Sequence, residues 1–80
     1  MDDQTILQRI EELSSEELEL EEEHASEALN KERTARLRSI ETELDQCWDL
    51  LRQRRARRTA GLDPDDAAVR AETVVEHYLQ

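Results

Sequence analysis

The sequence contains few of the residues that usually interrupt a helix or cross-link a small protein. It contains one Gly, one Pro, one Cys, one Trp, one Tyr and no Phe. A single cysteine excludes an internal disulfide and any structural zinc site built on two or more cysteines. The sequence shows no apolar run long enough to cross a bilayer and no charged-then-apolar leader. We therefore expect no membrane partner, and one unpaired cysteine favours the reducing cytoplasm.

What remains is a short, helix-rich and strongly acidic chain. Strong helix formers dominate its 80 residues, so the predicted fold class is all-α. Hydrophobic residues make up 36% of the chain, which supports only a thin core in one small domain. Oligomerisation is the favoured way to stabilise so thin a core, and a homodimer that forms a helical bundle is expected. The net charge of −10 argues against nucleic acid as a partner.

Apolar residues recur at helical spacing in two long segments, which predict helices at about 3–28 and about 31–60. The first segment carries two stripes: Ile6, Ile10, Leu13 and Leu20, and beside them Leu7, Leu18, Ala25 and Leu29. The second segment carries Leu37, Ile40, Leu44, Cys47 and Leu51. A turn is expected at Ala28–Asn30, with Asn30 as the N-cap of the second helix. This predicts an antiparallel, coiled-coil-like hairpin, with one unbroken helix as the alternative.

A short third element is predicted at about 64–79. Gly61 stands where a helix C-cap belongs, and Asp63, Pro64 and Asp66 form a strong helix-start signal. The new helix either continues past Arg70 or restarts near Thr73. We expect this segment to fold back and cover Trp48.

Three stretches resemble a known family. They are LDQCWDLLRQRRA (residues 44–56), Asp63-Pro64-Asp65 and the final VVEHYLQ (residues 74–80). Together they resemble a family of short bacterial proteins catalogued only as a domain of unknown function. The resemblance supports the hairpin and implies no activity.

The basic run RQRRARR (residues 52–58) is the most conspicuous charge feature. One interpretation is structural: the arginines suit the negative end of the helix dipole and lie near Asp2, Asp3 and the acidic start of the third element. An acidic protein partner and nucleic acid are the alternatives. The candidate partner-binding residues are Trp48, Arg52, Arg54, Arg55, Arg58 and Tyr78.

Two further hypotheses concern chemistry. Glu21-x-x-His24 has the spacing used by di-iron helical bundles, so Glu21 and His24 are weak metal candidates. The stretch of residues 37–55 loosely resembles the first helix of all-helical chorismate mutases, which hold a dicarboxylate with arginines. We favour neither, and predict a non-enzymatic interaction or assembly module with no cofactor, no metal site and no catalytic residue.

Overall fold

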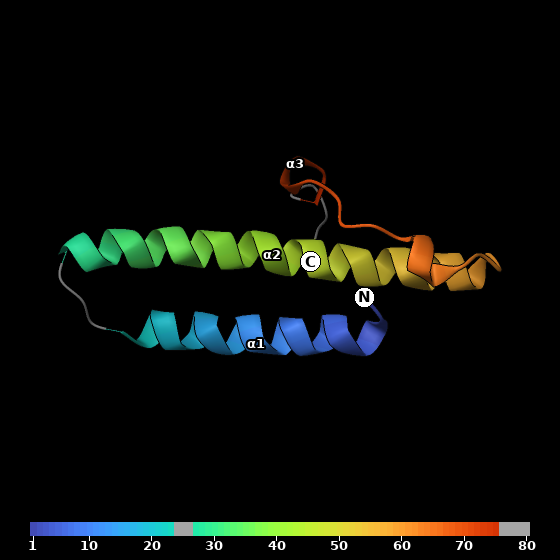
Figure 1. The fold of residues 1–80 in the computed structure, drawn as a ribbon. Coiled ribbons are helices and arrows are strands. Elements are labelled where there is room, and N and C mark those ends of the chain that lie inside the picture. The colour runs from blue at the N-terminus through green and yellow to red at the C-terminus, as the bar shows by residue number, and fades with distance from the viewer. Residues whose placement is uncertain (24–26, 76–80) are drawn as a thin grey trace.

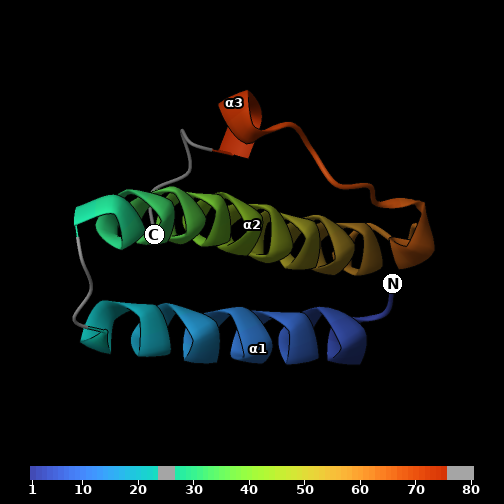
Figure 2. The same ribbon diagram turned by 60° about the vertical axis from the view of Figure 1, so that its left-hand side comes forward.

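The computed structural model describes residues 1–23 and 27–75, with the backbone alone for residues 27–29. The elements are α1 (Asp3–Glu22), α2 (Glu27–Thr59), a 3₁₀ turn η1 (Pro64–Asp66) and α3 (Glu72–Val75), and no strand occurs in the described residues. Helices α1 and α2 lie side by side and antiparallel, and the chain then returns along α2 (Figures 1 and 2). The predicted all-α hairpin with a short C-terminal helix is confirmed.

Helix α1 begins as its sequence suggests but ends early. The Asp2 carboxylate accepts a hydrogen bond from the Thr5 backbone N–H at 2.8 Å, which caps the first turn. The helix ends at Glu22, not near residue 28, and Glu23 is extended. Acidic residues crowd the last turn, which contains no basic residue. Negative charge at the negative end of the helix dipole favours this earlier end.

The turn predicted at Ala28–Asn30 is wrong. Helix α2 already begins at Glu27, so Asn30 lies inside it and is not its N-cap. Nothing at residues 27–30 breaks a helix, and the Asn30 carbonyl accepts a hydrogen bond from the Thr34 hydroxyl one turn later. Residues 24–26 lie outside the described part of the chain.

The core is the seam between α1 and α2. Its buried residues are Ile6, Ile10 and Leu13 from α1, and Ile40, Cys47, Leu50 and Leu51 from α2; Leu20 and Leu44 pack against them partly buried. Each fully buried Leu or Ile contributes roughly 1.5–3 kcal/mol, so the predicted stripes hold the two helices together. The second α1 stripe behaves differently, because Leu7 and Leu18 are exposed, while Ala25 and Leu29 lie outside the described side chains.

Helix α2 ends in a Schellman motif. Gly61 has a positive φ of 77°, its N–H donates to the Arg58 carbonyl, and the Leu62 N–H donates to the Arg57 carbonyl. The C-cap predicted at Gly61 is confirmed, and it turns the chain back toward α2.

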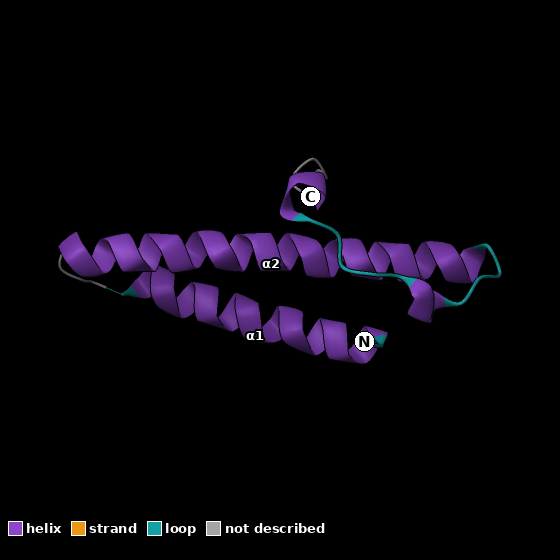
Figure 3. Ribbon diagram, turned by 45° about the horizontal axis from the view of Figure 1, so that its top comes forward, coloured by secondary structure: helices purple, strands orange, loops and turns teal. Residues whose placement is uncertain are grey.

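The returning segment is mostly not helical. The Asp63 carboxylate accepts from the Asp65 N–H, and Pro64 opens η1, but Ala67 is already extended and α3 starts only at Glu72. The predicted helix from residue 64 to about Arg70 is therefore wrong, as is its continuation past Arg70, whereas the alternative of a restart near Thr73 is seen. An extended backbone leaves the carbonyls of Ala68 and Arg70 free to accept hydrogen bonds from α2. Figure 3 shows this segment as a loop running along α2, and residues 76–80 lie outside the described part.

Candidate functional site

Arg54 joins three parts of the chain at the open end of the hairpin. Its side chain is buried, with Nε 2.5 Å from the Asp3 carboxylate. Its Nη1 lies 2.9 Å from the Asp65 carboxylate and also donates to the Pro64 carbonyl. These bonds raise the pKa of Arg54, with the Asp3 hydrogen bond as the largest cause. The expected proximity of the arginine run to Asp3 and to the acidic start of the third element is confirmed.

Asp3 is shared between two arginines of α2. The Arg58 guanidinium donates to both carboxylate oxygens, at 3.2 and 2.7 Å. The hydrogen bonds from Arg58 and then Arg54 lower the pKa of Asp3 from its ordinary value of 3.8 to about 2. Two of the arginines proposed for partner binding are thus engaged in holding α1 against α2.

The other proposed partner-binding residues are not gathered at this site. Arg55 is exposed and Arg52 is partly buried on α2. Tyr78 lies outside the described residues, as does His24 of the metal hypothesis. Glu21 is exposed at the end of α1, and no group of three or more potential metal ligands occurs in the described ranges. The metal hypothesis stays a prediction.

Beyond η1, the side chains of Gln46, Asp49 and Gln53 attach the returning segment to α2. The Asp49 carboxylate is completely buried and accepts from Arg70 Nη2 at 2.6 Å and Arg70 Nε at 2.9 Å. The side-chain amides of Gln53 and Gln46 donate to the carbonyls of Ala68 and Arg70. These residues recur at positions 46, 49 and 53, on a side of α2 turned away from Trp48.

The described part of the third element, residues 64–75, therefore does not cover Trp48 as expected. Trp48 keeps 40% of its surface exposed, and Leu7 and Leu18 on α1 keep 49% and 57%. Leu7 and Leu18 are eleven residues apart, so at about 100° per residue they share one side of α1.

The Arg9–Glu43 ion pair shows on which edge of the hairpin these three residues lie. Arg9 Nε is 2.5 Å from the Glu43 carboxylate, so both residues border the same edge of the seam. By helical angle, Leu7 and Leu18 lie across the buried stripe from Arg9, and Trp48 lies across Cys47 from Glu43. All three apolar residues border the opposite edge, which we call the apolar edge (Leu7, Leu18 and Trp48).

Sequence reasoning recognised parts of this arrangement and missed others. Trp48 was a partner-binding candidate, but Leu7 and Leu18 were assigned only to a second packing stripe. The signal available in the sequence was the position of Leu7 and Leu18 around the helix, which differs from that of the buried stripe. The pairing of Asp49 with Arg70 was not anticipated, although the polar row at 46, 49 and 53 marks a third contacting side of α2.

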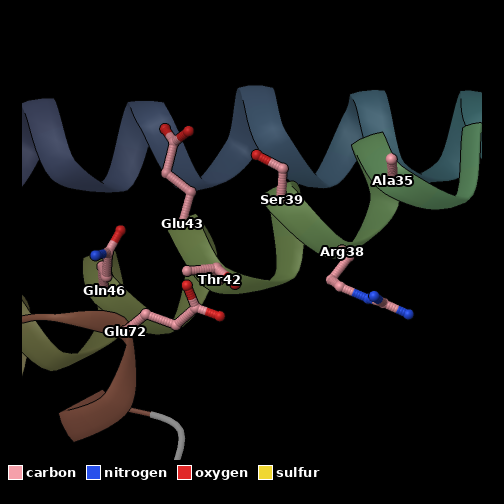
Figure 4. Close-up of a pocket in the computed structure, with 7 residues that line it drawn as sticks. All are labelled: Ala35, Arg38, Ser39, Thr42, Glu43, Gln46 and Glu72. Atoms are coloured by element: carbon pink, nitrogen blue, oxygen red, sulfur yellow. The ribbon is translucent and has the colours of Figure 1, made fainter. Parts of the chain in front are cut away.

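Two of the hollows along α2 bear on the hypotheses about chemistry. The larger of these, about 380 Å³, lies between α2 and α3 and is lined by Ala35 and six polar residues (Figure 4). Its lining includes one arginine, Arg38, which points away from Glu43 and Glu72 in Figure 4. The chorismate mutase-like alternative, which requires converging arginines, stays a prediction. The smaller hollow, about 180 Å³, has the buried Cys47 in its wall, and burial raises the pKa of that thiol.

Comparison with known proteins defines the family. The family model described as "Protein of unknown function (DUF2630)" matches residues 2–80. The chain belongs to this family. The DUF2630 chain is also 62% identical, over 47 residues, to uncharacterised proteins of Mycobacterium bovis and of two Mycobacterium tuberculosis strains. The match covers 59% of this chain and 54% of each relative, so the chain spans about half the length of the curated relatives it matches.

The predicted resemblance to a bacterial family of unknown function is confirmed. No solved structure matches this DUF2630 chain. Within its described residues, no helix is both long and apolar enough to span a membrane.

Proposed function

We propose that this DUF2630 chain is a non-enzymatic helical interaction module that works as a homodimer through its apolar edge. The observation that carries the proposal is the exposure of Trp48, Leu7 and Leu18 along one edge of the seam. Large aromatic and aliphatic side chains grouped on a surface are typical of protein-binding sites. The third element, which was expected to cover Trp48, is attached to a different side of α2.

The exposed area of the chain supports a partner of substantial size. The single chain exposes 5830 Å². A compact monomer of 9.4 kDa exposes about 5000 Å² by the usual scaling with mass. The surplus of about 800 Å² equals one partner's share of a standard protein interface. A second hairpin on the apolar edge would bury surface of this order.

The charged residues favour the apolar edge over the arginine run as the contact surface. Arg54 and Arg58 are bound to Asp3 within the chain, so an acidic partner would have to compete with that carboxylate. Binding of an acidic protein through the exposed Arg55 stays a prediction, as does location in the cytoplasm.

Sedimentation equilibrium across a range of protein concentrations tests the proposal. The wild type is expected to change from monomer to dimer as concentration rises. The variants Trp48→Gln and Leu18→Gln should remain monomeric over the same range. Leu62→Gln is the matched control, because Leu62 is 56% exposed but lies beyond α2, away from the apolar edge. A wild type that is monomeric at every concentration, or equal dimerisation of all variants, would refute the proposal.

A further inference from the structure

The two helices of the hairpin carry opposite net charges. Helix α1 contains eight acidic residues and one basic residue, a net charge of −7. Helix α2 contains nine basic and six acidic residues, a net charge of +3. Two copies of α1 packed side by side would therefore repel, whereas α1 beside the α2 of a second copy would attract.

We infer that two copies pair with their two-fold axis parallel to the helices, so that the bundle alternates α1, α2, α1 and α2 around its circumference. The inference rests on the proposed dimerisation and specifies its geometry. In this arrangement the two α1 helices are diagonal to each other, and every neighbouring pair is antiparallel and opposite in net charge. A two-fold axis perpendicular to the helices would instead allow α1 to lie directly against α1.

The same geometry brings the apolar edges together in layers. Asp3 bonds to Arg54, and Arg9 bonds to Glu43, so Leu7 lies at about the level of Trp48. Rotation about an axis parallel to the helices shifts no residue along that axis. Leu7 and Trp48 would therefore meet the partner's Leu7 and the partner's Trp48 in a single layer.

A second apolar layer follows at the level of Leu18. Glu16 bonds to Arg36, so Leu18 lies near the level of Leu37, which is partly buried on the Trp48 side of α2. The apolar edge then closes in two layers, one at each end of the overlap between α1 and α2. Antiparallel helices at the small crossing angles of four-helix bundles accommodate this pattern.

Spin-label distances at three heights along α1 test the arrangement. Thr5, Glu12 and Glu19 are exposed, are seven residues apart, and lie on one side of the helix, more than about 90° around it from Leu7 and Leu18. Each would be changed to Cys separately in a Cys47→Ala background and labelled. A parallel axis predicts the same label-to-label distance at all three positions, within about 5 Å, because no residue moves along the helix.

A perpendicular axis predicts a different result. The separation along the helix is then twice the height above the axis, so it varies by at least about 20 Å among three sites spaced about 10 Å apart. Because this separation adds at right angles to the lateral one, the label-to-label distances vary by less than that but by more than the variation of about 5 Å allowed for a parallel axis. Distances that vary in this way in a dimeric protein would overturn the alternating bundle and leave the proposed dimer intact. A sample with no dipolar coupling, and a monomer by sedimentation, would instead refute the proposed function itself. Circular dichroism of each labelled variant checks that the hairpin has formed.

Discussion

Removal of the buried Asp49 carboxylate should release the returning segment from α2. Asp49 is completely buried and accepts three hydrogen bonds, two from Arg70 and one from Gln53. Breaking a fully buried ion pair costs roughly 3–5 kcal/mol, and breaking an exposed pair roughly 0–1 kcal/mol. The Arg70 side chain is 39% exposed, so the pair lies between these limits. We expect Asp49→Ala to lower the free energy of unfolding by about 2 kcal/mol.

Removal of Asp49 and removal of Arg70 are expected to lower the free energy of unfolding by different amounts. Asp49→Ala leaves Arg70 with access to water, so its guanidinium can be hydrated again. Arg70→Ala leaves the Asp49 carboxylate buried without its Arg70 partner, which is the more expensive loss. Arg70→Ala should therefore destabilise more than Asp49→Ala, and the double variant should show a coupling of about 1–2 kcal/mol.

Urea unfolding followed by circular dichroism measures these differences, with amide hydrogen exchange to locate them. Exchange should accelerate most in the returning segment of residues 67–75, while the buried seam changes less. Arg55→Ala is the matched control, since it removes an exposed arginine of the same helix and should change stability by no more than about 0.5 kcal/mol. Additive effects of Asp49→Ala and Arg70→Ala would refute the assignment of this pair as the attachment point.

Other features of the hairpin lead to three further predictions. Leu13→Ala should cost about 3 kcal/mol in urea unfolding because Leu13 is fully buried, whereas Leu18→Ala should matter only at concentrations where dimers form. Gly61→Ala should lower the free energy of unfolding by about 1 kcal/mol in the same measurement, because Gly61 has a positive φ. A Cβ at this position meets no atom within 4 Å, so the cost comes from the backbone alone. A larger loss of stability would contradict this origin. The lowered pKa of Asp3 stabilises the fold at pH values above the ordinary value of 3.8, and this contribution is lost as the pH falls toward 2. Asp3→Asn should therefore reduce the pH dependence of the free energy of unfolding in that window. An unchanged acid-unfolding profile would count against the two arginine bonds.

The comparison of sequence with structure separates local from tertiary causes. The stripe of Ile6, Ile10 and Leu13 was predictable because helical periodicity is a short-range property of the chain. The cap at Gly61 was predictable for the same reason, since a positive φ favours glycine wherever it occurs. The turn was misplaced because no Gly or Pro enforces it, and the early end of α1 depends on charge repulsion summed over several glutamates.

The candidate site depended more on tertiary structure. The sequence predicted that the third element would pack over Trp48. It did not show that Gln46, Asp49 and Gln53 would bind the returning segment on another side of α2. That choice depends on hydrogen bonds between residues 15 to 24 positions apart, which no local pattern encodes.

The sequence by itself therefore determined that this chain forms two amphipathic helices, that the stripe of Ile6, Ile10 and Leu13 is buried, and where the second helix ends. Only the tertiary structure decided which arginines of the run, Arg54 and Arg58, would bond to Asp3, and that Trp48 would remain exposed beside Leu7. The physical reason is that burial of a helical stripe follows from spacing along one segment. The partner of a buried charge is instead set by which distant segments the fold brings within hydrogen-bonding distance.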